Sequence, residues 1–191
     1  MSRPRVRRVS DLADARIGVG IALAVGLTWG FRSIVTLAQP DPFHPIQPID
    51  YLAVVSFSVA LAVLSPAAWL VARVAERTRW RGLDRVLGAT AIILAVSAPI
   101  AGFGNLIEDG FGAKDVGGAL YVAGLSGVLC GLLGLSVSLA LGGRWALAGL
   151  CAATFGGILA SEHYVGGLVV LAVWLVFASS IWRPRSTDAT A

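Results

Sequence analysis

Long apolar runs, separated by short stretches that contain charge, proline or glycine, limit what this chain can fold into. A bilayer core of roughly 30 Å requires about 20 helical residues. Six runs reach or approach that length: 17–37, 51–74, 86–107, 118–141, 145–160 and 164–182. Only 14% of the 191 residues are charged and 57% are apolar, whereas soluble domains carry about 25% charge. The sequence predicts an all-α integral membrane protein, with residues 1–191 forming one six-helix transmembrane domain, and excludes a soluble globule or a nucleic-acid binder.

The basic residues predict the orientation of this bundle. Thirteen of the 15 Lys and Arg residues lie in the tail 1–16 or in the stretches at 73–85, 144 and 183–185. Short basic loops stay in the cytoplasm, so we expect both termini there and the basic tail 1–16 against anionic lipid headgroups. The first run is longer than a signal peptide requires and lacks a cleavage site, which favours a retained helix. Arg outnumbers Lys 14 to 1, which indicates a bacterial genome and hence the inner membrane.

Small residues predict how the helices pack. Gly124, Gly127, Gly131 and Gly134 recur at three- and four-residue steps, which places them on one helix face where backbones can approach closely. We expect this face to contact the helix 145–160, since only residues 142–144 separate the two runs in a tight hairpin. The alternative is a seam between two copies of the chain.

Two prolines interrupt apolar runs near mid-membrane. Pro66 and Pro99 each lack a backbone donor, so both are expected to kink their helices. Such breaks serve substrate binding in some transporters, although single prolines also occur in membrane helices for packing alone.

Polar residues concentrate on the predicted extracytoplasmic side. At 1.5 Å per residue, Arg32 lies about 22 Å beyond Ile17, Glu108 about 33 Å beyond Val86, and His163 about 27 Å beyond Trp145, so they share one depth. We expect a polar site there, formed by Arg32, Asn105, Glu108, Asp109, Glu162 and His163. In this hypothesis Glu108 or Asp109 holds Arg32, Gly110 closes the third helix, and the site binds an anion, a metal or a proton. Alternatively, Arg32 only snorkels and neutralises the end of that helix.

The residues around this site support weaker predictions. The proline-rich loop 40–48 is either a rigid connector or a lid that places Phe43 and His44 over the site. Asp50 and Asp115 are interpreted as helix N-caps. His44 and His163 lack ligand spacing along one helix, and the two cysteines lie in apolar runs, so neither a metal site nor a disulfide framework is expected.

No phosphate-binding loop and no nucleophile elbow is present, so no catalytic residue and no cofactor is predicted. The leading hypothesis is a small non-enzymatic accessory or envelope component of the inner membrane. Its partners would be membrane lipids, another membrane protein or further copies of the chain. A small-solute or proton-coupled transporter or channel, with Glu108 or Asp109 as carrier, is the first alternative. A membrane-embedded enzyme that uses His163 with a carboxylate is the second.

Overall fold

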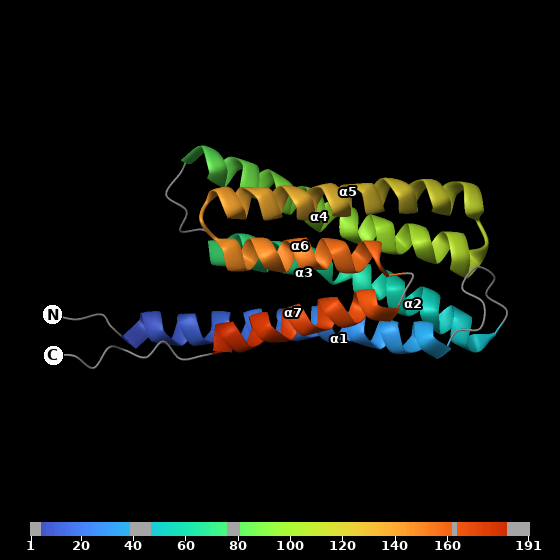
Figure 1. The fold of residues 1–191 in the computed structure, drawn as a ribbon, viewed down its shortest axis with the longest axis horizontal. Helices are drawn as coiled ribbons and strands as arrows, with labels where there is room; N and C mark the ends of the chain where they lie inside the picture. Colours follow the sequence, from blue (N-terminus) through green and yellow to red (C-terminus); the bar gives the residue numbers. More distant parts are fainter. Residues whose placement is uncertain (1–4, 39–46, 76–80, 162–163, 183–191) are drawn as a thin grey trace.

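A computed structural model describes residues 5–38, 47–75, 81–161 and 164–182 of the chain, and every regular element in them is helical (Figure 1). The elements are α1 (Arg5–Ala38), α2 (Pro48–Ala62), α3 (Leu64–Ala75), α4 (Arg81–Asn105), a π-helical turn η1 (Leu106–Gly110), α5 (Lys114–Leu141), α6 (Trp145–Leu159) and α7 (Tyr164–Trp182). The predicted all-α class is confirmed.

Five helical segments of the described chain are long and apolar enough to cross a membrane: Asp14–Ala38, Pro48–Ala75, Leu83–Gly110, Lys114–Leu141 and Val165–Trp182. The sixth apolar helix, α6, has 15 residues, which corresponds to about 22 Å of helix. Helix α6 is thus shorter than a typical bilayer core, and the number of spans depends on it.

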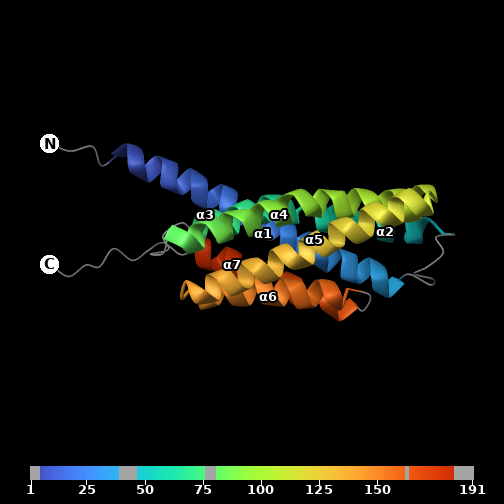
Figure 2. The same ribbon diagram turned by 90° about the horizontal axis from the view of Figure 1, so that it is seen from above.

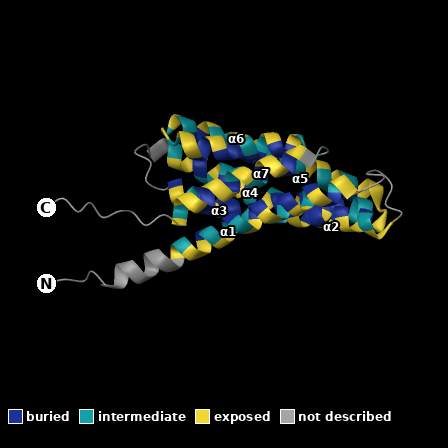
Figure 3. Ribbon diagram, turned by 60° about the horizontal axis from the view of Figure 1, so that its bottom comes forward, coloured by how far each residue is buried: buried dark blue, intermediate teal, exposed yellow. Residues whose placement is uncertain are grey.

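The α2–α3 segment lies at the centre of the bundle. Within its most apolar window 61% of residues are buried, against 33–39% in the other four spans. Helices α4 and α5 pack along one side of the bundle, α1 and α7 along the opposite side, and α6 contacts both α5 and α7 (Figures 1 and 2). Buried residues face inward and exposed ones line the periphery (Figure 3). The start of α1 and the end of α7 lie at the same end of the bundle.

Pro66 explains why the central segment is two helices. Its ring lacks an N–H and collides with the carbonyl four residues earlier, that of Ala62. The helix is interrupted at Val63, which caps α2 through its N–H to Val59 O at 3.0 Å. The expected kink at Pro66 is therefore confirmed. Pro99, by contrast, lies within α4, which continues to Asn105 without interruption.

The glycine face of α5 packs against α4, and the expectation that it contacts the helix 145–160 was wrong. A Cβ atom at Gly124 would collide with the backbone of Ala101, and one at Gly131 with Leu94. Gly127 and Gly134 face Ser97 and Thr90 in the same way. Helix α6 contacts a different face of α5, where Ser136 Oγ donates to Ala148 O at 3.0 Å. Chain proximity predicted a hairpin correctly but did not determine which face of α5 it uses.

Two glycines form the turns around α5. Gly143 has φ 73° in the predicted tight hairpin, where Arg144 N–H donates to Leu139 O at 2.7 Å. At the other end of α5, the residue with positive φ is Gly112, at 71°, rather than Gly110. The expectation that Gly110 closes its helix was wrong, because the chain makes the π turn η1 before it reverses.

The acidic residues predicted as N-caps lie inside their helices. Helix α2 begins at Pro48 with Gln47 as its N-cap, and Asp50 Oδ2 accepts a hydrogen bond from Gln47 N–H at 2.9 Å. Helix α5 begins at Lys114, so Asp115 lies in its first turn. Both carboxylates still meet the positive end of a helix dipole.

Candidate functional site

The described residues of the predicted polar site lie in one half of the bundle. Arg32 is six residues before the end of α1, Asn105 ends α4, and Glu108 and Asp109 belong to η1. We call this part the Arg32 half, and the part containing the end of α3 the Arg73 half. Glu162 and His163, like the lid residues Phe43 and His44, lie outside the described residues.

Asn105 joins two helices. Its side chain is 5% exposed, and Nδ2 donates to Ser58 Oγ at 3.0 Å and to Val54 O at 3.3 Å, both on α2. Ser58 Oγ in turn donates to Val54 O at 2.9 Å. Such interhelical polar contacts hold membrane helices together where apolar surface gives no drive. Asn105 thus fixes α4 against α2.

The two carboxylates of η1 face α5. The backbone of Glu108 contacts Gly117, where a Cβ atom would collide with it. Asp109 and Lys114 attract each other electrostatically. Lys114 is thus one cation near this acidic helix end.

The structure does not pair Arg32 with Glu108 or Asp109. Within the described residues, the ion pair present is Arg73 with Asp14, at 2.8 Å. The prediction relied on shared depth, but depth along a helix leaves the direction around its axis undetermined. The guanidinium of Arg32 lies over Phe57 of α2, whereas η1 packs more against α5 than against α2. The expected pairing was wrong for this reason.

Arg32 instead lies against an aromatic cluster that sequence reasoning missed. Its Cζ atom is 5.3 Å from the centroid of the Phe57 ring. Trp29 and Tyr121 meet the same ring edge-to-face, with centroid distances of 5.9 and 6.3 Å. The available signal was Trp29 one helical turn before Arg32, because residues three apart share a helix face.

Four polar atoms in this stretch of α1 are buried without a hydrogen-bond partner. Arg32 Nε and Nη1, Trp29 Nε1 and Ser33 Oγ are buried without a hydrogen-bond partner. Trp29 is 0% and Ser33 2% exposed. Most buried polar atoms in proteins have a partner, so four such atoms within five residues distinguish this stretch of α1.

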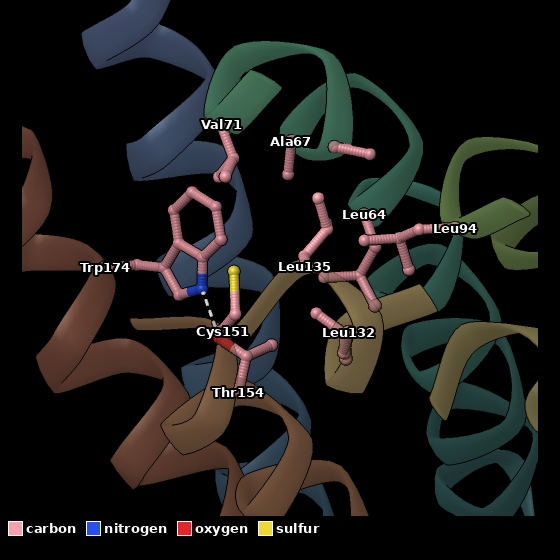
Figure 4. Close-up of a pocket in the computed structure, with 10 residues that line it drawn as sticks. Leu64, Ala67, Val71, Leu94, Leu132, Leu135, Cys151, Thr154 and Trp174 are labelled. Atoms are coloured by element: carbon pink, nitrogen blue, oxygen red, sulfur yellow. Dashed lines mark hydrogen bonds between the residues drawn. The ribbon is translucent and has the colours of Figure 1, made fainter. Parts of the chain in front are cut away.

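The cavity at the bundle centre is small and apolar (Figure 4). It measures about 10 Å³ and is lined by side chains from α3, α4, α5, α6 and α7. Its polar lining atoms are satisfied: Trp174 Nε1 donates to Thr154 Oγ1 at 3.0 Å, and Thr154 Oγ1 to Leu150 O at 2.8 Å. A water molecule needs roughly this volume and several free polar partners, so the cavity suits no polar solute.

Among the described residues, no group of three or more His, Cys, Asp or Glu side chains is placed to hold a metal ion. Cys130 and Cys151 are free thiols. Comparison with models of known protein families, with curated proteins and with solved structures finds no match.

Proposed function

We propose that this chain is a small multi-pass protein of the bacterial inner membrane that acts as a non-enzymatic accessory or envelope component. It works through contacts with partner helices or lipids. In this proposal six helices cross the membrane, and both termini are cytoplasmic.

The tight packing of α4 against α5 and the small apolar cavity at the bundle centre are the observations that support this proposal. Helices α4 and α5 meet through glycines without intervening space, and the central cavity is too small for a solute. A transporter needs an aqueous path that reaches its carrier residues. An enzyme needs a pocket beside its acid and base. A tightly packed bundle instead acts through the contacts that its outer surface makes with lipids or other helices.

Two observations support the proposed location of both termini in the cytoplasm. Helix α1 begins and α7 ends at the same end of the bundle (Figure 1), and basic residues lie near that end.

The number of membrane crossings depends on whether the short helix α6 spans the bilayer. We propose labelling single cysteines at Gly142, whose φ is −78°, and Ser161 with a membrane-impermeant thiol reagent in intact cells, after Cys130→Ala and Cys151→Ala. Labelling on opposite membrane faces is expected. Labelling on one face would show that α6 does not cross.

Reconstitution tests the accessory role against transport. Proteoliposomes that contain the wild-type chain should leak protons and small cations no faster than empty vesicles. Purification in mild detergent should recover a membrane-protein partner in a fixed ratio. Proton flux that Glu108→Gln abolishes and Asp115→Asn leaves unchanged would refute the accessory role and establish transport.

A further inference from the structure

In the Arg32 half, two residues that contact one aromatic ring have buried N–H groups without a hydrogen-bond partner. Arg32 Nε and Nη1 and Trp29 Nε1 are buried without acceptors, and both residues contact Phe57. The guanidinium gains cation–π attraction from the ring face, but a ring supplies no oxygen acceptor and no countercharge. An arginine within a membrane span is costly unless it is paired.

One edge of the guanidinium remains accessible. Arg32 is partly exposed overall, and Nη2 is not among its buried unpartnered atoms. A guanidinium presents paired N–H groups that fit two oxygens of one anion. Two oxygens of an anion can bind either the Nε–H and Nη2–H pair, at the side of the guanidinium, or the Nη1–H and Nη2–H pair, at its end. Nη2 takes part in both pairs. An anion that arrives at Nη2 therefore also satisfies one buried N–H group.

The depth of Arg32 determines which anion it meets. Arg32 lies six residues before Ala38, about 9 Å along the helix. A lipid phosphate can reach an arginine at that depth, because local thinning of the bilayer and water defects form around a charged residue within a span. The planar fork of arginine binds phosphate in two-point contact.

We propose that Arg32 and the donor cluster around Phe57 form a binding site for a phosphate group, supplied by a phospholipid headgroup or by free inorganic phosphate. The site neutralises the buried charge and fixes one lipid at the junction of α1 and α2. This proposal is independent of the accessory role, since a transporter would need the same compensation.

Arg73 provides a matched control. Its Cζ atom also lies over an aromatic ring, 4.8 Å from the centroid of Trp69. It differs because Nη2 already donates to Asp14 Oδ2 at 2.8 Å. Arg73→Gln therefore removes a similar cation–ring contact, but the arginine that it removes already has a hydrogen-bond acceptor.

Native mass spectrometry of the full chain in neutral detergent tests the site. Wild type and Arg73→Gln should retain one phosphatidylglycerol, whereas Arg32→Gln should bind it at least tenfold more weakly. Diacylglycerol with the same acyl chains should not bind. Displacement of the lipid by millimolar inorganic phosphate would assign the site to the free ion, and its persistence would assign the lipid.

Two results would overturn the proposal. One is equal retention of phosphatidylglycerol by wild type and Arg32→Gln. The other is equal binding of diacylglycerol and phosphatidylglycerol by wild type, a comparison that holds even if Arg32→Gln fails to fold. Arg32→Lys, which keeps the charge but lacks the fork, should bind with intermediate strength.

Discussion

The Arg32 half and the Arg73 half each place an arginine over an aromatic ring, yet the two arrangements differ in solvent access. Arg73 and Asp14 are 45% and 47% exposed and share a hydrogen bond. Arg32 is more enclosed, and two of its nitrogens have no partner. Water screens the first pair, so its removal changes little. The second cation lies where an unsatisfied donor is costly. The comparison shows that the same cation–ring contact occurs with satisfied donors at an exposed site and with unsatisfied donors at a more buried one.

The same two halves differ in how closely the helices approach. In the Arg32 half, Cβ atoms at Gly104 and Gly117 would collide with the backbones of Tyr121 and Glu108. Toward the Arg73 half, Gly127 and Gly134 meet the side chains of Ser97 and Thr90, and Gly131 approaches the backbone of Leu94 less closely. Backbone contact leaves no atom that can move aside. The Arg32 half is therefore the less tolerant of added volume.

The largest expected effect comes from a methyl group in this backbone contact. Gly104→Ala must separate α4 from α5 and should reduce the free energy of unfolding by about 3 kcal/mol. Gly88→Ala on the same helix has no atom within 4 Å of its Cβ position and should be neutral or stabilising by up to about 1 kcal/mol. Unfolding of both variants in one detergent checks the difference. Equal stability would contradict the close approach.

The buried amide should give the next largest effect. Asn105→Ala removes two interhelical hydrogen bonds and should cost about 1 to 2 kcal/mol. Ser136→Ala, which removes the hydrogen bond from Ser136 to Ala148 O between α5 and α6, should cost about 0.6 kcal/mol. Chemical unfolding monitored by tryptophan fluorescence measures both. A larger loss of unfolding free energy for Ser136→Ala than for Asn105→Ala would contradict the stronger interhelical hydrogen bonding expected in the Arg32 half.

A smaller effect is expected for the exposed ion pair. Asp14→Asn should reduce stability by about 0.2 to 1 kcal/mol at low ionic strength, and added salt should remove most of the difference. The measurement is the thermal midpoint of wild type and variant from low to high salt. A loss that salt leaves unchanged would show that the Arg73 half buries this pair.

The smallest expected effect is the coupling between Arg32 and Glu108. These side chains form no ion pair in the structure, so the cost of Arg32→Gln should not depend on Glu108→Gln. A double-mutant cycle on unfolding free energies should yield a coupling near zero. Coupling above about 0.5 kcal/mol would restore the pairing that the sequence predicted.

Sequence reasoning located the described part of the polar site but not its contacts. Arg32, Asn105, Glu108 and Asp109 were placed in the same half of the bundle because helical rise converts residue number into depth. The neighbours of three of these residues were missed: Phe57 lies against Arg32, Ser58 accepts a hydrogen bond from Asn105, and Lys114 acts electrostatically on Asp109. Rotation around each helix axis decides such contacts, and it depends on how all the helices pack together.

What the sequence determined by itself follows from local physics. Apolar length predicts helices, Pro66 breaks one of them, and residues 142–144 form a hairpin, since each depends on a few consecutive residues. Only the tertiary structure decided that α2–α3 is the central segment, that the α5 glycines face α4, and that Arg32 lies over Phe57 without a hydrogen-bond acceptor. These outcomes depend on which helix faces pack together, and several arrangements of the same apolar helices bury similar amounts of surface.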